Sequence, residues 1–508
     1  MYQPYQVPQW LRTDWDRLSA EEIRELQNRK LRDFVRDQLY PHSPYYREMF
    51  DRLGLAPDDI QSTDDLVKIP FTSKADLAPT ADDPDRPNRF VLMPGELKKW
   101  TEQDAKTRRR IYRELTAAER TDHEKMLWEY YPVHANHTTG RTAQPTPIWF
   151  TQRDLAAYTE GARRTATLVN RDRLGRAVST YPFTVVSHQA FWLNPITALG
   201  LGFSVLHTGG GKIAGTQAIL DMIERSKPSY LVAMPGYMYH LCRTALQQGR
   251  DFSSVTHVAL GGEKLTVELK QKLTGNLVEL GADPDDLSVL GSYGFTENKG
   301  GLSECQTPPG DFRSYGYHTR PDMEFFEVID PVSGQRVGEG ETGEIVYTAL
   351  DTRGTAVIRY RTGDIAVGGI VSGPCPNCGR TVPRISYDIR RSSLVQEFHL
   401  SKVKGTLLDL NAFSPILNGH PLVQEWQLEI GKRNGDPFDV DEITLYVALA
   451  EQADQSTFTR EIHERFHREL EVTPNRIVFR SLPALLEQIG METELKEKRV
   501  IDLRALRA

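Results

Sequence analysis

Cysteine is scarce in this chain, which has four cysteines in 508 residues. So few cysteines cannot form a disulfide framework, which excludes the small secreted classes that depend on one. No apolar run is long enough to cross a bilayer. The first residues, Met1 to Pro4, also lack the basic and apolar blocks of a signal peptide. We therefore expect a cytoplasmic protein that has no membrane partner.

The chain also lacks a strong excess of charge of either sign. Its formal net charge is −7, which argues against a nucleic-acid-binding surface over the whole chain. Hydrophobic residues make up 39% of the sequence, enough for the large core of an ordinary globular protein. A chain of this length suggests two to four domains.

Short apolar runs alternate with helix-like segments between residues 203 and 290. The expected strands are 203–207, 230–234, 255–260 and 287–290, and the expected helices between them are 215–226, 236–248 and 265–280. Such alternation predicts βαβ units and a mostly parallel sheet, so the expected fold class is α/β. The next region, 324–370, is β-rich, with strands expected at 344–348 and 356–360.

The two ends of the chain differ from this central part. Residues 15–39 are rich in helix formers and predict a helix. After about residue 392 the pattern becomes that of a smaller α+β unit. We therefore expect a large N-terminal domain over residues 1–391 and a small C-terminal domain over residues 392–508.

The segment 97–130 is charged and carries a basic run made of Lys106 and Arg108 to Arg110. One interpretation is one or two surface helices. The other is a contact for a substrate or partner, because a basic run can bind phosphate groups.

One stretch organises the chemistry, residues 291–300, which reads Gly-Ser-Tyr-Gly-Phe-Thr-Glu-Asn-Lys-Gly after an expected strand. Loops at the carboxyl ends of strands are where open α/β sheets bind ligands. Gly294 would let the backbone approach a ligand closely. Thr296 offers a hydroxyl and Glu297 a hard oxygen ligand, which suits a phosphate and its Mg²⁺. The alternative is an ordinary turn with one stray glutamate.

Three further segments carry the same kind of chemistry. The polar loop 136–142 could wrap phosphate oxygens, although it is not a Walker loop. Gly261-Gly262-Glu263 follows a strand and would let a flat ring lie against the backbone. Asp364 follows a glycine turn, where a carboxylate can accept both hydroxyls of a ribose. Plain turns remain the alternative for the first two segments.

Taken in order, these segments resemble the adenylate-forming superfamily, and within it the phenylacetate–CoA ligase family. The resemblance runs nearly end to end. The matching segments are 45–47, 69–77, 138–140, 261–263, 293–297, 343–346, 358–364 and 496–502. In that family the small C-terminal domain is a mobile lid, and the segment 97–130 looks like an insertion.

The resemblance implies a role for each matching residue. The ATP phosphates would be held by Thr138, Thr139 and Gly140; the adenine would be bordered by Gly262, Glu263 and Tyr293. Thr296 would contact the α-phosphate and Glu297 would hold Mg²⁺. Asp364 would bind the ribose, and Arg391 would act near the hinge. Lys496 would bridge the carboxylate and the α-phosphate, where a cation offsets the accumulating negative charge.

The sequence departs from the family pattern at several of these points. His137 stands where a glycine is usual, and Ser392 and Ser393 replace the usual hinge aspartate. Extra residues, about 397–401, follow the hinge. Leu495 precedes the motif lysine in place of a glycine. The hinge rotation and the acceptor of the acyl group are the features that these changes affect.

A metal site and an acyl pocket complete the expected set. Cys375 and Cys378 have the spacing of a zinc knuckle, with Cys305 and His318 as further ligands, as in some family members. Free thiols in a turn are the alternative. For the acid, the best candidates are His188, Phe191 and Trp192, which lie where the family has an aromatic substrate wall, although an aromatic stripe can also be plain core.

These observations predict an ATP-dependent ligase that adenylates a carboxylic acid, most simply an aromatic one, and transfers the acyl group to CoA. Its cofactors would be ATP, Mg²⁺, CoA and a structural Zn²⁺. An alternative keeps the adenylation and changes the acceptor to an amine, a carrier-protein thiol or another nucleophile. A third hypothesis is a nucleotide-binding protein without turnover. The expected partners are small molecules and no nucleic acid, and a homodimer stays open as the assembly.

Overall fold

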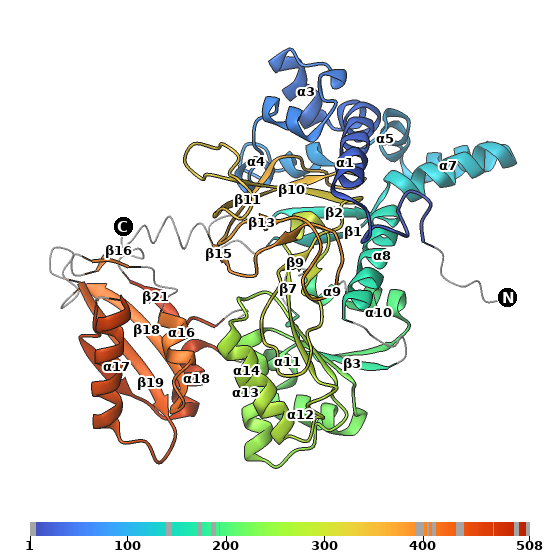
Figure 1. The fold of residues 1–508 in the computed structure, drawn as a ribbon. Helices are drawn as coiled ribbons and strands as arrows, with labels where there is room; N and C mark the ends of the chain where they lie inside the picture. Colours follow the sequence, from blue (N-terminus) through green and yellow to red (C-terminus); the bar gives the residue numbers. More distant parts are fainter. Residues whose placement is uncertain are drawn as a thin grey trace.

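The fold was analysed in a computed structural model of the chain (Figure 1). The structure describes residues 7–138, 145–169, 175–183, 189–192, 194–391, 401–403, 406–408, 413–432, 441–470, 472–491 and 497–503. Among these residues no helix combines the length and the apolarity that a membrane crossing needs.

The large domain begins with helices that pack on an antiparallel sheet. Helix α1, Ala20–Phe34, starts at a capping box in which the Ser19 hydroxyl accepts from the Glu22 amide at 3.2 Å. The expected helix from residue 15 was therefore wrong at its start, because this cap fixes the first turn. The sheet has the order β10-β11-β12-β15. Its strands are β10, Glu324–Ile329; β11, Gly343–Ala349; β12, Tyr360–Ala366; and β15, Ile389–Arg391.

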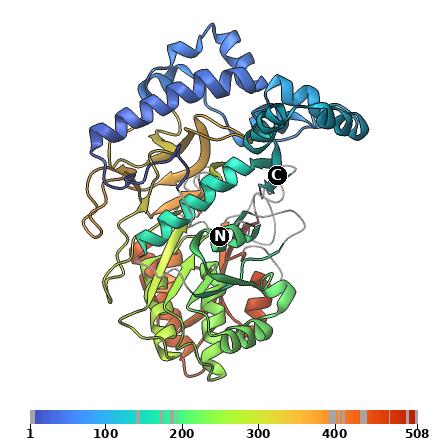
Figure 2. The same ribbon diagram turned by 90° about the vertical axis from the view of Figure 1, so that its right-hand side faces the viewer.

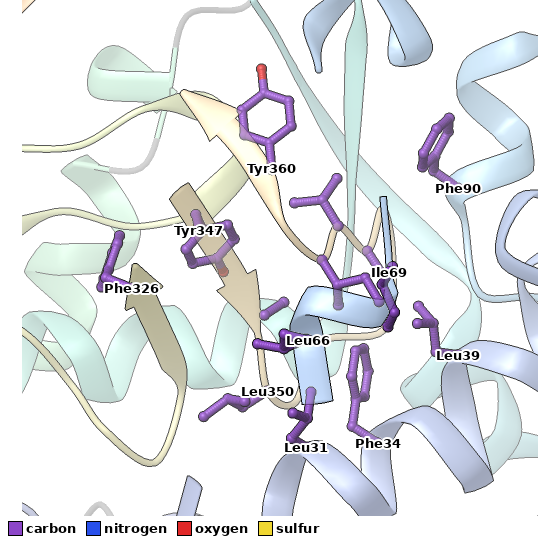
Figure 3. Packing of buried hydrophobic residues seen from close by; sticks show 14 of the residues in the cluster. Leu31, Phe34, Leu39, Leu66, Ile69, Phe90, Phe326, Tyr347, Leu350 and Tyr360 are labelled. Carbon is purple, nitrogen blue, oxygen red and sulfur yellow. The ribbon is translucent and has the colours of Figure 1, made fainter. Parts of the chain in front are cut away.

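Apolar side chains from the helices and this sheet form one buried cluster (Figure 3). The labelled members include Leu31 and Phe34 of α1 and Tyr347 of β11. The strand expected at 356–360 was wrong, because Arg359 has a φ of 47° and turns the backbone before β12 begins at Tyr360.

A nine-stranded sheet forms the second layer, and its parallel part runs β7-β6-β5-β3-β4. The strands are β3, Arg176–Ser179; β4, Ser204–His207; β5, Tyr230–Ala233; β6, His257–Leu260; and β7, Ser288–Tyr293. The helices between them include α12, Thr216–Ser226; α13, Pro235–Gln247; and α14, Val267–Glu279. The expected parallel α/β arrangement is confirmed. All five parallel strands end at one edge of the sheet.

The C-terminal part forms a separate sheet with the order β20-β19-β18-β21. Its strands are β18, Val423–Lys432; β19, Asp441–Leu449; β20, Arg476–Phe479; and β21, Val500–Asp502. Its helices are α16, Phe413–Asn418; α17, Gln455–Leu470; and α18, Leu482–Ile489. This sheet, α16 and α17 share a core of their own. They form the red lobe of Figure 1, which lies behind the green parallel region in Figure 2.

The large domain contacts the C-terminal lobe through two side chains that donate hydrogen bonds to main-chain oxygens of the lobe. The Arg243 guanidinium donates to the carbonyl oxygen of Gln424 at 2.7 Å, and Lys272 Nζ donates to that of His420 at 3.3 Å. Leu485 of α18 joins the apolar core beneath α13. The expected domain boundary falls at residues 392–400, which lie outside the described residues.

The segment 97–130 forms exposed helices α5, Gly95–Thr101; α6, Ala105–Glu114; and α7, Ala117–Tyr130. The Arg108 guanidinium folds back to donate to the carbonyl oxygens of Thr101 and Gln103, each at 3.0 Å. Helix α7 projects on the opposite side of the large domain from α17 (Figure 1). In this arrangement the basic run does not lie beside the C-terminal lobe.

Candidate active site

After β7, at the carboxyl edge of the parallel sheet, the backbone of residues 294–300 folds back so that its two ends lie close together. Thr296–Asn298 forms a single 3-10 turn. A Cβ placed on Gly294 would lie 2.6 Å from the carbonyl oxygen of Gly300. A glycine is therefore required at position 294 because the backbone returns close to it, which is a reason that the sequence analysis did not give.

Glu297 is buried in this turn and is oriented by a second strand. The Tyr360 hydroxyl, at the start of β12, donates to Glu297 Oε1 at 2.6 Å. Glu297 is 8% exposed, and Thr296 beside it is half-buried. Tyr360 belongs to a predicted motif, but the sequence analysis gave it no role of its own. A carboxylate can accept several ligands, so this hydrogen bond leaves Glu297 suited to a hard cation.

Three other predicted residues meet along β12. The Tyr293 hydroxyl donates to Asp364 Oδ2 at 2.9 Å. Asp364 is buried, and its amide donates to Thr362 Oγ1 at 3.1 Å. In the β12–β15 pairing Asp364 stands opposite Arg391. The residues expected around the adenine, the ribose and the hinge are therefore neighbours.

The loop after β6 lies next to this group. Gly262 has a φ of 86°, which favours glycine, and it is exposed. A Cβ placed on Gly261 would lie 2.9 Å from the Tyr181 hydroxyl, so a side chain there would collide with it. Burial raises the pKa of Tyr181, with the Glu263 charge as the next cause, so this hydroxyl stays protonated. Gly261 is therefore packed against its neighbours, and the exposed backbone of the loop is that of Gly262.

Glu263 connects this loop to the C-terminal lysine motif. Its carboxylate accepts from the Gly236 amide at 3.4 Å. A Cβ placed on Gly236 would also collide with the carboxylate of Glu497, which follows Lys496 in the sequence. Lys496 itself lies outside the described residues. The described remainder of the motif continues through Arg499, whose guanidinium pairs with the buried carboxylate of Glu425.

The predicted phosphate loop joins the two strands of a hairpin, β1, Pro132–His137, and β2, Pro147–Thr151. The amide of Thr138 donates to the carbonyl oxygen of Thr146 at 3.0 Å, which extends the hairpin by one pair. Thr139 and Gly140 lie outside the described residues. Burial lowers the pKa of His137, the residue that replaces a glycine.

Two of the predicted pocket residues lie in an aromatic cluster at the other end of the sheet edge. Phe191 and Trp192, in α9, Gln189–Trp192, have ring centroids 5.6 Å apart. Phe183, which follows β3, lies 5.4 Å from Phe191, and so does His207 at the end of β4. His188 lies outside the described residues.

Phe183 and His207 were not predicted from the sequence. Both follow the carboxyl end of a parallel strand or stand at it. That position could have indicated His207, because its strand was expected, but the strand before Phe183 was not. Burial lowers the pKa of His207, so its imidazole is neutral near pH 7. The cluster is therefore apolar, with one neutral polar ring.

The four predicted metal ligands converge. Ligand atoms of Cys305, His318, Cys375 and Cys378 all lie within 4.8 Å of one another. The sulfurs of Cys305 and Cys375 are 3.9 Å apart, close to the roughly 3.8 Å that tetrahedral Zn–S bonds of about 2.3 Å imply. His318 Nε2 lies 3.3 Å from the Cys378 sulfur. The donor set and its spacing fit a structural zinc ion.

The electrostatics of the cluster favour the thiolate form of one ligand, Cys378. The pKa of Cys378 is held well below its usual range, first by a hydrogen bond from the Cys305 thiol and then by His318, against the effect of burial. The Asn377 amide donates to the Cys305 sulfur at 3.2 Å. A thiolate that accepts such hydrogen bonds is the form of cysteine that binds metal.

Comparison with known proteins identifies the class. The family model described as AMP-binding enzyme matches residues 31–352. The phenylacetate-coenzyme A ligase of Escherichia coli (strain K12) is 25% identical over 501 residues, 96% of each chain. The phenylacetate-coenzyme A ligase of Thermus thermophilus is 24% identical over 485 residues, 92% of this chain and 89% of the relative.

Solved structures confirm the fold. The structure of 2-hydroxyisobutyryl-CoA ligase in the postadenylation state, in complex with 2-HIB-AMP, matches with a TM-score of 0.75 and 20% identity over 100% of this chain and 96% of that chain. The same ligase in the thioesterification state matches with a TM-score of 0.59 and 19% identity over the same shares.

The family model and the curated relatives together support an AMP-forming acid–CoA ligase. The chain belongs to the AMP-binding enzyme family, and it groups with the phenylacetate–CoA ligases of the adenylate-forming superfamily. The family identified from the sequence motifs is confirmed.

Proposed function

We propose that this protein uses ATP to convert a carboxylic acid, most simply an aromatic one, to an acyl-AMP and then transfers the acyl group to CoA. One observation carries the proposal. Two hydrogen bonds tie the stretch after β7 to β12: the Tyr293 hydroxyl donates to Asp364 at 2.9 Å, and the Tyr360 hydroxyl donates to Glu297 at 2.6 Å. A polar site at this edge is where an open α/β sheet binds a nucleotide.

The nucleotide would lie along this edge. The ribose hydroxyls would bind Asp364, the adenine would lie between Tyr293 and the loop of Gly262 and Glu263, and Arg391 would act beside them. Thr296 would donate to the α-phosphate. Thr138, Thr139 and Gly140 would hold the other phosphates. Mg²⁺ would be held by the Glu297 carboxylate, and when bound it would offset the charge of the phosphate oxygens.

Lys496 would supply the cation for the adenylation step. The acid carboxylate attacks the α-phosphorus, a P–O bond forms, and pyrophosphate leaves with the electrons of the bond that breaks. Two anions approach each other in this step, so a positive charge between them stabilises the transition state. The position of Glu497 beside Gly236 and Glu263 supports this role, because it brings the C-terminal motif to the same edge.

The aromatic cluster of Phe183, Phe191, Trp192 and His207 would receive the acid, with His188 as a further candidate. Its side chains offer flat apolar surfaces, which suit an aromatic ring. The curated relatives are named for phenylacetate, whereas the solved structure is named for the small aliphatic 2-hydroxyisobutyryl group. The fold alone therefore does not decide the acid.

CoA is the proposed acceptor, because the relatives that align along most of the chain are named coenzyme A ligases. Transfer would require the C-terminal domain, proposed as residues 392–508, to turn against residues 1–391 after adenylation. A hinge needs only a few residues that can change φ and ψ, so serines at positions 392 and 393 permit the turn. An amine, a carrier-protein thiol or another nucleophile is the alternative acceptor.

We also propose that Cys305, His318, Cys375 and Cys378 hold one structural Zn²⁺. Four protein ligands leave no open position for catalysis. The ion would instead connect the segments that carry the four residues, including β9, Tyr317–His318.

The test is a panel of aromatic and aliphatic carboxylic acids assayed for pyrophosphate release from ATP, with and without CoA. Aromatic acids should give the highest kcat/KM, and CoA should yield the corresponding thioester. Release without a thioester would replace CoA by another acceptor. Preference for small aliphatic acids would overturn the aromatic assignment. No release with any acid would leave a nucleotide-binding protein without turnover.

A further inference from the structure

Lys299 has a backbone conformation that is uncommon for a residue with a side chain. Its φ is 54°, in the left-handed region, and it ends the 3-10 turn two residues after Glu297. Only Lys227 and Arg359 share a positive φ with it among the described non-glycine residues. Glycine adopts this conformation without steric cost. A non-glycine residue keeps such a conformation where its surroundings offset the strain, so the contacts of the lysine side chain are of interest.

The Lys299 side chain turns into the protein and not toward solvent. Its side chain is 8% exposed, and Nζ donates to Asp154 Oδ2 and to Thr352 Oγ1, each at 2.8 Å. Nζ also lies 5.3 Å from the ring centroid of Phe150, within the range of a cation–π contact. Burial lowers the pKa of Lys299. Burial alone would raise that of Asp154, but the lysine charge and the hydrogen bonds lower it to about 2.

Asp154 collects hydrogen bonds from separate segments. It lies in the first turn of α8, Gln152–Leu168, and accepts from the Thr151 amide at 3.0 Å. It also accepts from the Thr352 hydroxyl at 2.8 Å and from the amides of Arg353 and Gly354 at 2.9 and 2.8 Å. An ionised carboxylate has the lone pairs to accept this many donors.

The segment after Gly354 continues the connection to the β1–β2 hairpin. The amide of Thr355 donates to the carbonyl oxygen of Trp149 at 2.9 Å, and the Trp149 amide donates to Thr355 Oγ1 at 2.9 Å. Trp149 lies in β2, the strand that follows the proposed phosphate loop. A continuous set of buried contacts thus runs from the Glu297 turn through Lys299 and Asp154 to that hairpin.

We propose that Lys299 and Asp154 are positioning residues that fix the Glu297 turn relative to the β1–β2 hairpin, and so hold the metal ligand in one orientation. The inference rests on the proposed adenylation function. The pair acts from behind the turn, while Tyr360 orients the Glu297 carboxylate from β12. A metal ligand whose support is removed binds its ion less tightly because it no longer holds one orientation.

The test uses Lys299→Met and Asp154→Asn in the full-length chain, since each removes the ion pair and keeps a side chain of similar size. Lys270→Met is the matched control. Lys270 faces the carboxylate of Glu304 at 3.4 Å, and both side chains are 6% exposed, against 8% and 4% for Lys299 and Asp154. Mn²⁺ binding is titrated by electron paramagnetic resonance with a non-hydrolysable ATP analogue. Tm and the kinetics of pyrophosphate release are measured alongside.

Both variants should bind Mn²⁺ roughly tenfold or more weakly and lose kcat by a similar factor, the scale seen when the support of a metal ligand is removed. KM for the acid should not change. The control should lose Tm but keep its Mn²⁺ affinity.

Loss of Tm with wild-type Mn²⁺ affinity in Lys299→Met and Asp154→Asn would make the pair purely structural and overturn the proposal. If neither variant folds, Lys299→Gly is measured in the same way, because glycine accepts the left-handed backbone and only the side chain is lost. Wild-type Mn²⁺ affinity in Lys299→Gly would also overturn it. Absence of pyrophosphate release in the wild type would contradict the proposed function, while the Mn²⁺ titration would still decide the role of the pair.

Discussion

The hydroxyl of Tyr360 donates a hydrogen bond of 2.6 Å to Glu297, and both residues are buried. The contact joins the turn after β7 to the start of β12, two motifs that lie 63 residues apart in the sequence. It holds one carboxylate oxygen in place, so the direction of the other is fixed as well.

Tyr360→Phe should therefore weaken Mg²⁺-dependent adenylation. We expect kcat to fall roughly tenfold, with a higher Mg²⁺ requirement, because the metal ligand loses its orienting partner. Removing this hydrogen bond should cost about 1 kcal/mol of unfolding free energy. Tyr40→Phe is the control, since the Tyr40 hydroxyl also donates to a carboxylate, that of Asp51 at 2.9 Å, but in an exposed bond between N-terminal helices. Equal Mg²⁺ dependence in both variants would refute the role of Tyr360.

Lys496→Ala should lower acyl-AMP formation by roughly 10²-fold or more, the scale found when a group that stabilises developing charge is removed. ATP binding should change little, because other residues hold the nucleotide. The measurement is acid-dependent pyrophosphate release, with Lys498→Ala as the neighbouring control. Adenylation at the wild-type rate would reject Lys496, and Lys498 would become the candidate.

Purified protein should carry about one zinc ion per chain, as four ligands and a tetrahedral geometry require. Cys378→Ser should lose that zinc and unfold at a lower temperature, because binding free energy of a structural metal contributes to folding. The buried residue Cys242 provides the control, and Cys242→Ala should keep its zinc. Metal analysis that finds no zinc in wild-type protein prepared without chelator would exclude the site.

Trp192→Ala should raise KM for an aromatic acid roughly tenfold while KM for ATP stays the same. The indole is part of the proposed pocket wall, and a pocket contact of this kind is worth roughly 10- to 200-fold in discrimination. Trp100→Ala, in the exposed helix α5, is the control for loss of a tryptophan. An unchanged preference among acids would show that the cluster is ordinary core.

The stability of the protein should depend on Asp154 in acid. Its folded pKa is about 2, below the ordinary value of 3.8, so its stabilising effect is present above pH 4 and is lost as the pH falls toward 2. The shift corresponds to about 2 kcal/mol. Urea unfolding at pH 6 and pH 3 should show a smaller difference for Asp154→Asn than for the wild type. If the unfolding free energy changed equally between pH 6 and pH 3 in both proteins, Asp154 would not be the source of the acid sensitivity.

Much of the fold was predictable because the relevant signals are local. Alternating strands and helices between residues 203 and 290 predicted the parallel sheet, and Cys-x-x-Cys spacing predicted the metal cluster. The start of α1 was missed because one cap, Ser19, outweighs helix propensity further upstream. The strand predicted at 356–360 was wrong because Arg359 adopts a positive φ, and no residue pattern in the sequence indicates that conformation.

The site was predictable as a set of motifs but not as a set of contacts. The chemistry of the residues singled out Glu297 and Asp364, and the family resemblance added Tyr293, while the hydrogen bonds that these residues make depend on tertiary packing. Lys299 was not singled out, because a lysine in a polar turn is typical of a solvent-exposed residue. The positioning role of Lys299 follows only from its ion pair with the buried carboxylate of Asp154.

The docking of the C-terminal lobe has a consequence for how the sequence can vary. Arg243 and Lys272 bind main-chain oxygens of Gln424 and His420, and every amino acid carries such an oxygen. Residues 420 and 424 can therefore drift during evolution without loss of these bonds. Arg243 and Lys272 cannot change in this way, because their side chains are the donors. We therefore expect these two positions to vary less among related sequences than positions 420 and 424.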